Sequence, residues 1–217
     1  MDQELLTAIA DPEKGGQSWH EAGNLVPYVI QVMAEKIESR FPGGLTASAE
    51  TGCGKSTILL SHLSKRHICF TLGGQNDNSL DTVRSFAHFR PANVTFILGP
   101  SQQTLPTFAW DTKLDFALID GAHAYPFPEL DYFYFYPRLN PGAIFVIDDV
   151  HIPTISRLYE FMKEDDMFQL DALWGTTAFF TRTDSGTFPP YGDGWNIQNY
   201  NKARFPVDHS ADRHYEE

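Results

Sequence analysis

Short apolar runs alternate with segments of helical periodicity through most of this chain. The apolar runs span residues 45–50, 67–72, 93–98, 115–120 and 143–148. Helical segments follow at residues 57–65, 80–89, 129–139 and 154–164, and a polar loop follows the third run. Parallel strands that are buried on both faces read as continuous apolar runs, and helices connect them across the sheet. We therefore predict a doubly wound α/β domain with a mostly parallel sheet.

Two apolar segments close the pattern, FQLDAL at residues 168–173 and TAFFTRT at residues 177–183. The turn between them, at Trp174 and Gly175, is short enough for a hairpin. We expect this hairpin to add an antiparallel strand at the edge of the sheet.

The two ends of the chain lie outside this alternation. A helical pattern between Trp19 and Arg40, ended by the turn at residues 41–44, predicts a lid or packing helix. The expected organisation is an N-terminal lid or packing region at 1–44, the α/β domain at 45–183 and a C-terminal extension at 184–217. That extension is rich in Gly, Pro, Asn and Asp but keeps several aromatic residues. It therefore either wraps over the domain, contacts a second copy in a homodimer, or is disordered.

Composition excludes some partners. The chain has 217 residues, with 16 Lys and Arg against 28 Asp and Glu, and a net charge of −12. This charge repels a nucleic-acid backbone, so a small-molecule substrate is the better prediction. No apolar run approaches the roughly 18 residues of a membrane span. The N-terminus lacks the features of a signal peptide, and Cys53 and Cys69 lack metal-ligand spacing, so we expect a cytoplasmic protein with structural cysteines.

The segment SAETGCGKST, residues 48–57, fits two different motifs. It matches a loose phosphate-loop pattern in which Ala49 replaces the first glycine and Lys55 is the phosphate-binding lysine. It also matches E-x-G-x-G from Glu50, a turn after a strand that holds a nucleoside cofactor. In both interpretations, Gly52 and Gly54 are expected to allow positive φ and a close backbone approach at a helix N-terminus.

The charges near this turn favour a cationic ligand. The strand ends that should converge there carry Glu50, Asp120, Asp148 and Asp149, with Lys55 as the one obvious cation. Two like charges at 4 Å repel by about 4 kcal/mol at an effective dielectric of about 20, so a triphosphate would bind poorly without a divalent metal. Magnesium reconciles the phosphate interpretation in part.

Four ordered segments resemble motifs of the class I S-adenosylmethionine-dependent methyltransferases, and within them the small metal-dependent O-methyltransferases. The segments are AETGCGKSTILLS, NVTFILGPSQQTLP, DFALIDGAHAY and LNPGAIFVIDDVHIP. The resemblance covers about residues 45–182 and implies a Rossmann-like methyltransferase fold with S-adenosylmethionine as the cofactor. The sulfonium group of this cofactor is positively charged, which suits an acidic pocket. The resemblance implies cofactor contacts at Glu50, Thr51, Gly52, Gly54, Ser56, Gly73, Ser101 and Asp120.

In this resemblance Glu50 acts on the amino-acid end of the cofactor or on the loop amides, and Lys55 faces solvent. The chain also departs from the family pattern. Thr71 and Gly73 stand where an acid usually holds the ribose at the end of strand two, and Gln75 or Asp77 are the alternatives. Pro100 replaces the acid that many relatives have before Ser101.

Three carboxylates predict a metal site. Asp120 ends the fourth strand and Asp148 and Asp149 end the fifth, so the three should come close together. Such an oxygen-rich set suits a divalent cation, with Mg²⁺ as the first choice. The resembled enzymes bind an ion at the corresponding positions. The alternative is that Asp148 caps the next helix and Asp120 binds loop amides, without a metal.

Methyl transfer to a hydroxyl oxygen needs a base and an aligned acceptor. His123 and His151 follow the same two strands and are candidates for the general base or a further ligand, with Asp120 as a third catalytic candidate. The alternative is two surface histidines. The aromatic run at residues 131–137 predicts helix packing, whereas Tyr125 and Trp19 are pocket candidates and Trp19-His20 a candidate lid.

The sequence thus predicts an S-adenosylmethionine-dependent methyltransferase that acts on a small-molecule hydroxyl with divalent metal assistance. Two alternatives stay open. One is a phosphate-loop ATPase or kinase, and the other is a non-catalytic domain that binds S-adenosylmethionine.

Overall fold

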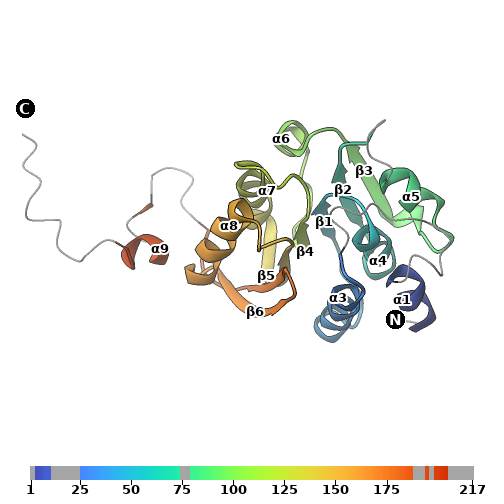
Figure 1. Cartoon of the computed structure of the whole chain (residues 1–217), viewed down its shortest axis with the longest axis horizontal. Helices are drawn as coiled ribbons and strands as arrows, with labels where there is room; N and C mark the ends of the chain where they lie inside the picture. The colour runs from blue at the N-terminus through green and yellow to red at the C-terminus, as the bar shows by residue number, and fades with distance from the viewer. Residues whose placement is uncertain (1–2, 11–24, 74–78, 188–193, 196–197, 205–217) are drawn as a thin grey trace, which may run out of the picture.

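A computed structural model describes residues 3–10, 25–73, 79–187, 194–195 and 198–204. The strands of one mixed sheet have the order β3-β2-β1-β4-β5-β7-β6 (Figure 1). Their bounds are β1 Ser48–Thr51, β2 His67–Thr71, β3 Val94–Leu98, β4 Leu114–Ile119, β5 Leu139–Ile147, β6 Phe168–Trp174 and β7 Thr177–Arg182. The predicted mostly parallel, doubly wound sheet is confirmed.

Helices connect the strands. The α-helices are α1 Gln3–Ala10, α3 Pro27–Arg40, α4 Lys55–Leu63, α5 Ser79–Ser85, α6 Ser101–Thr104, α7 Phe127–Phe135, α8 Pro153–Glu164 and α9 Asn199–Lys202. Short 3₁₀ helices lie at η1 Pro91–Asn93, η2 Leu105–Thr107 and η3 Tyr136–Arg138. None of these described helices combines the length and the hydropathy needed to cross a bilayer.

The direction of each strand pair explains where a site can form. Strand β1 pairs in parallel with β2 and with β4, and β4 pairs in parallel with β5. The strand order therefore reverses between β1 and β4, with the carboxyl ends of these strands at one edge. Ligands of open α/β sheets bind outside this edge, at the point of reversal.

The predicted C-terminal hairpin with an antiparallel strand at the sheet edge is confirmed. Strand β7 pairs antiparallel with both β5 and β6, so it lies one position inside the sheet, and β6 forms the edge. The buried β7 sequence, with Ala178, Phe179 and Phe180 inaccessible to solvent, explains this order. The more exposed β6 takes the edge, where one side of the strand has no neighbour.

Two apolar cores hold the sheet between its helices (Figure 1). On one face, residues from α1, α3, α4 and α5 pack against Phe116 and Val146 of the central strands. On the other face, α7 and α8 cover Phe70, Phe145 and Phe180. The aromatic run in and after α7 contributes to this second core, since Tyr132, Phe135 and Tyr136 are buried, and the packing prediction is confirmed.

The predicted N-terminal helix corresponds to α3, which begins after Val26 with proline at its first position. Its buried residues Val29, Ile30, Met33 and Ile37 recur at helical spacing, so the helix packs on the sheet. Trp19 and His20, the candidate lid, lie outside the described residues.

The C-terminal extension is described in part. Helix α9 packs on α8, where the rings of Tyr200 and Phe161 lie 5.6 Å apart. Arg204 forms an ion pair with Glu164 at 2.7 Å, and Asn199 donates a hydrogen bond to Asp166. This part of the extension therefore wraps over the domain.

Candidate active site

The turn after β1 fits closely between two neighbouring strands. Gly52 has φ of +94° and donates its amide hydrogen to Phe70 O of β2 at 2.9 Å. A Cβ atom at Gly52 would lie 2.1 Å from the carbonyl oxygen of Asp120, at the end of β4. Only glycine fits this position, and the turn therefore contacts the backbone of the reversal point directly.

Gly54 differs from the prediction made for it. Its φ of 179° is extended backbone that any residue adopts, so the expected positive φ is wrong for this glycine. A Cβ atom there would meet no other atom within 4 Å. The space above Gly54 is open, and α4 begins at the next residue.

Glu50 points away from the turn, into the protein beneath α4. Its carboxylate is fully buried and accepts hydrogen bonds from Thr57 Oγ1 and from His67 Nε2, the latter at 3.0 Å. Thr57 Oγ1 in turn accepts the amide hydrogen of Gly54 at 3.0 Å. Glu50 therefore reaches a loop amide through Thr57 rather than by direct contact.

Lys55 does not face solvent, and that expectation is wrong. The residue is 4% exposed, and its Nζ lies 3.4 Å from the carbonyl oxygen of Ala10 in α1. The N-terminal helix covers the first turn of α4, which sequence periodicity cannot reveal. Ser56 beside it is also buried. This lysine contacts α1, which does not favour the phosphate-loop interpretation.

The carboxyl ends of β4 and β5 bring three potential ligands together. Asp120, His123 and Asp149 each offer one donor atom, and these atoms lie within 4.8 Å of one another. Asp120 Oδ1 is buried and has no hydrogen-bond partner among the described residues. His123 Nε2 lies 3.4 Å from Asp149 Oδ2. This arrangement suits a cation with oxygen and nitrogen ligands.

Asp149 adopts a strained backbone conformation. Its φ of +55° is the one positive value found for a residue other than glycine in the described parts of the chain. Its other oxygen, Oδ1, lies 3.6 Å from Nδ1 of His151, so the carboxylate stands between both predicted histidines. Strained residues of this kind cluster at functional sites.

Asp148 is held by a neighbouring strand. It is buried, and its Oδ1 accepts a hydrogen bond of 2.5 Å from Thr177 of β7. It is absent from the close group formed by Asp120, His123 and Asp149. His123, a candidate further ligand in the sequence, belongs to that group, and Asp148 lies near enough for its charge to raise the pKa of Asp120.

Several carboxylates repel one another at this edge of the sheet. Burial raises the pKa of Asp120 well above its ordinary value, and the charges of Asp148, Glu50 and Asp149 raise it further. Burial also raises the pKa of Asp148, which the hydrogen bond from Thr177 opposes. A bound cation would relieve this repulsion.

The other predicted cofactor residues surround the turn. Thr51 ends β1 and Ser101 begins α6, while Gly73, with φ of +59°, packs against Leu98 and Leu80 after β2. Thr71 is buried. Gln75 and Asp77, the alternatives for the ribose contact, lie outside the described residues.

Tyr125, a pocket candidate, is 59% exposed, and the Arg157 guanidinium lies 5.3 Å from its ring centroid. This ring stands at the surface of the loop after β4. Its contact with Arg157 orients it there by a cation–π interaction.

Asp131 of α7 is a buried acid that the sequence analysis treated as part of the packing run. It is fully buried, close to the hydroxyls of Thr51 and Ser101. A Cβ atom at Gly121 would lie 3.4 Å from Asp131 Oδ2. This carboxyl therefore lies under three strand-end loops. In the sequence, the position of Asp131 on the polar side of an aromatic helix was the one feature that could have indicated a functional role.

We predict that Asp131→Asn removes a pH-dependent loss of stability. Burial raises the pKa of Asp131 from 3.8 to about 6, and the nearby side chains of Thr51 and Ser101 oppose this rise. Because the folded state holds this proton more tightly, the stabilisation is present below the unfolded pKa and is lost as pH rises through about 6. The loss amounts to about 3 kcal/mol.

Urea denaturation of both proteins between about pH 4 and pH 7.5 checks this linkage. The unfolding free energy of the wild type should fall relative to that of Asp131→Asn across this range. Parallel pH profiles for the two proteins would contradict it.

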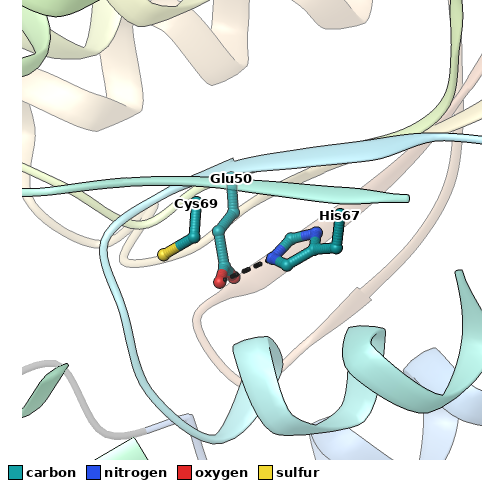
Figure 2. A group of neighbouring side chains, drawn as sticks. All are labelled: Glu50, His67 and Cys69. Carbon is teal, nitrogen blue, oxygen red and sulfur yellow. Dashed lines mark hydrogen bonds and ion pairs between the residues drawn. The ribbon is translucent and has the colours of Figure 1, made fainter. Parts of the chain in front are cut away.

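A buried polar cluster lies beneath the turn. Figure 2 shows the carboxylate of Glu50 between the Cys69 sulfur and the His67 ring. His67 and Cys69 are two residues apart on β2, so they share a face, and Cys69 pairs in register with Glu50. The pattern His-x-Cys on a strand beside an acid was the signal that the sequence analysis missed.

Comparisons with known proteins agree with this fold. Residues 49–150 match a family model described as "Methyltransferase domain". The O-methyltransferase from Bacillus cereus in complex with SAH is similar at a TM-score of 0.63 and 17% identity, covering 84% of this chain and 92% of that chain. No curated protein sequence matches the chain significantly.

Two further structures share the fold. The O-methyltransferase TomG from Streptomyces achromogenes, in complex with SAM, has a TM-score of 0.60 and 17% identity, over 84% of this chain and 91% of that chain. MycE from the mycinamycin biosynthetic pathway, in complex with Mg and SAH, has a TM-score of 0.52 and 12% identity, over 87% of this chain and 56% of that chain.

The matched segment runs from β1 to the end of β5 and contains the turn, Asp120, His123 and Asp149. The strand order and the antiparallel β7 are those of the Rossmann-like methyltransferase fold. Residues 49–150 therefore match a methyltransferase domain, and the fold of the chain agrees with that match.

Proposed function

We propose that this protein transfers the methyl group of S-adenosylmethionine to a hydroxyl oxygen of a small molecule, assisted by a divalent cation. The observation that carries this proposal is the close group of Asp120, His123 and Asp149 beside the Gly52 turn. The group lies at the reversal point of the sheet, next to the turn of a methyltransferase domain. Cofactor and acceptor would therefore bind side by side.

The residues fit a sulfonium cofactor. The backbone of the turn passes close to β4 at Gly52 and leaves open space above Gly54. Thr51, Ser56, Gly73 and Ser101 would line the remaining contacts, and Asp120 would face the positive sulfur. The similar structures of TomG and the Bacillus cereus enzyme hold SAM and SAH.

The residues also fit a hard divalent cation such as Mg²⁺. Asp120 Oδ1 is a buried carboxylate oxygen without a hydrogen-bond partner among the described residues, and Asp149 adds a second carboxylate. Asp148 is the third predicted ligand, although Thr177 occupies one of its oxygens. MycE, a more distant structural neighbour, was solved with Mg.

The cation, when bound, would orient an acceptor hydroxyl and lower its pKa. The reaction forms a bond between the acceptor oxygen and the methyl carbon while the carbon–sulfur bond breaks, and the hydroxyl proton leaves. His123 would take that proton on a ring nitrogen, and the Asp149 carboxylate, with Oδ2 3.4 Å from His123 Nε2, would stabilise the resulting imidazolium. Asp120 would supply a carboxylate to the cation and to the positive sulfur of the cofactor.

His151 is the weaker candidate for the base. Its side chain is 59% exposed, against 36% for His123, and it lies 3.6 Å from Asp149 at the rim. The loop of His123 is fixed by Thr154, whose hydroxyl donates to the carbonyl oxygen of His123 at 2.5 Å. We therefore assign the proton transfer to His123 and leave His151 to orient Asp149.

A methyl-transfer assay with chelator tests the proposal. Purified protein is incubated with labelled S-adenosylmethionine and panels of catechols and sugars, because a vicinal diol chelates a cation best. We expect methylation of a diol that falls at least about 100-fold in EDTA and returns with Mg²⁺. Turnover that ignores EDTA would leave the carboxylates as structural residues. Cofactor binding without turnover on any acceptor would favour a non-catalytic binding domain.

A further inference from the structure

The buried cluster beneath the glycine turn has donor atoms of three kinds. Glu50, His67 and Cys69 are each 0% exposed, and one oxygen, one nitrogen and the sulfur lie within 4.8 Å of one another (Figure 2). They come from two adjacent parallel strands, so the sheet holds them in register. The cluster lies beneath α4, and a different set of residues forms the active site.

We propose that Glu50, His67 and Cys69 form a second, structural metal site for a borderline cation of the Zn²⁺ class. Zinc takes thiolate, imidazole and carboxylate ligands, and its structural sites are closed to solvent. The carboxylate and a thiolate together balance the double charge of the ion. The hard, oxygen-rich group at Asp120 and Asp149 would select a different metal.

An unsatisfied oxygen points to a ligand at this site. Glu50 Oε2 is buried and has no hydrogen-bond partner among the described residues, although Oε1 accepts two hydrogen bonds. A buried carboxylate oxygen without a partner costs folding free energy. A cation bound between Glu50 and Cys69 would satisfy it.

A second set of contacts orients the imidazole. Ser48 Oγ lies 2.8 Å from His67 Nδ1 and 2.6 Å from Ser64 Oγ, and all three side chains are buried. This hydrogen bond turns Nε2 toward Glu50 and Cys69. Histidines that bind metals nearly always have their other ring nitrogen held in this way.

The donors suffice for four-coordination. His67 Nε2, Cys69 Sγ and the two Glu50 oxygens supply four atoms. The metal would occupy the place of the proton between His67 Nε2 and Glu50, with the ring proton of His67 on Nδ1 facing Ser48, and the thiol proton of Cys69 would leave on binding. The bound ion would join β1 to β2 directly below Gly52, whose carbonyl accepts from Cys69 Sγ at 3.1 Å. It would thereby support the turn from beneath.

Cobalt absorption spectroscopy tests this site. The full-length protein is stripped of metal with a chelator and titrated with Co²⁺, which gives a charge-transfer band when a thiolate binds it. We expect the band in the wild type at one Co²⁺ per chain, and its loss on addition of Zn²⁺. Asp149→Asn should keep the band, because the hard site has no sulfur ligand.

Two cysteine variants serve as a matched pair. Cys69→Ser should lose the band, whereas Cys53→Ser, which changes the neighbouring thiol in the turn, should keep it. Far-ultraviolet circular dichroism confirms that each variant folds. Zinc at about 100 times its dissociation constant should raise the melting temperature of the wild type by about 5–10 °C and leave that of Cys69→Ser unchanged.

Three outcomes would overturn the proposal. The wild type shows no thiolate band, the band survives in Cys69→Ser, or it disappears in Cys53→Ser instead. The first would mean that the hydrogen bonds from His67 and Thr57 alone hold Glu50. The site concerns stability and metal content, so its failure leaves the methyl-transfer proposal untouched.

Discussion

Replacing Gly52 with alanine is expected to destabilise the fold by about 4 kcal/mol, through overpacking and backbone strain together. The added Cβ atom would lie 2.1 Å from the backbone oxygen of Asp120, and φ is +94°. Because the obstacle is backbone rather than a flexible side chain, the turn must move away from β4. We expect the affinity for S-adenosylmethionine to fall by at least about 100-fold, as a loss of about 2.7 kcal/mol.

Gly54→Ala is the matched control for this substitution. Its extended φ of 179° and the absence of atoms within 4 Å of the added Cβ predict a change in stability within about 0.5 kcal/mol. Urea denaturation and calorimetry with S-adenosylmethionine measure both variants. Equal stabilities for Gly52→Ala and Gly54→Ala would contradict the close contact between the turn and β4.

Asp149→Gly is expected to reduce methyl transfer by about 10²–10³-fold without loss of stability. The substitution removes the carboxylate that lies near both His123 and His151. Glycine accepts φ of +55° without strain, so the backbone has no reason to change. Initial-rate kinetics with a diol acceptor, together with thermal denaturation, separate the two effects.

Asp148→Asn tests whether the neighbouring acid has the same role. Since Thr177 occupies Oδ1 of Asp148, we expect a smaller loss of activity, at most about 10-fold, and a lower stability from the altered hydrogen bond. If Asp148→Asn and Asp149→Gly lost activity equally, the three-carboxylate set predicted from the sequence would be the better description.

The fold was largely predictable because its pattern is local. Buried parallel strands appear in the sequence as continuous apolar runs, whereas amphipathic helices show apolar residues at helical spacing. The alternation of these two patterns along the chain therefore predicted the sheet and its connecting helices. The order of the hairpin strands was not predictable, since either β6 or β7 can pair with β5. That choice depends on which strand is more apolar on both faces, which only packing reveals.

The sequence could predict at which strand ends the site lies, but not which side chains face it. Acids after β4 and β5 had to lie near the turn, and Asp120 and Asp149 do so. The φ of Asp149 and the hydrogen bond from Thr177 to Asp148 then decide which carboxylate faces the site. Both depend on contacts between residues far apart in the chain.

The remaining features could not be predicted because they depend on which neighbouring element each side chain faces. The period of a strand places Ser48 and Glu50 on one face but does not say that this face lies against His67 and Cys69 of β2. Lys55 faced solvent in the prediction because α1, which covers it, lies 45 residues away in the sequence.

The acidic strand edge is the physical basis of the proposed function. Asp120 is buried among the charges of Asp148, Glu50 and Asp149, all of which raise its pKa. A cationic cofactor and a divalent ion both relieve this repulsion, whereas phosphate groups would increase it.

Calorimetry of the wild-type protein with S-adenosylmethionine, and separately with ATP and Mg²⁺, tests whether the acidic strand edge selects a cationic ligand. We predict binding of one S-adenosylmethionine per chain and no detectable heat from ATP. Binding of ATP at the turn, with no binding of S-adenosylmethionine, would contradict it.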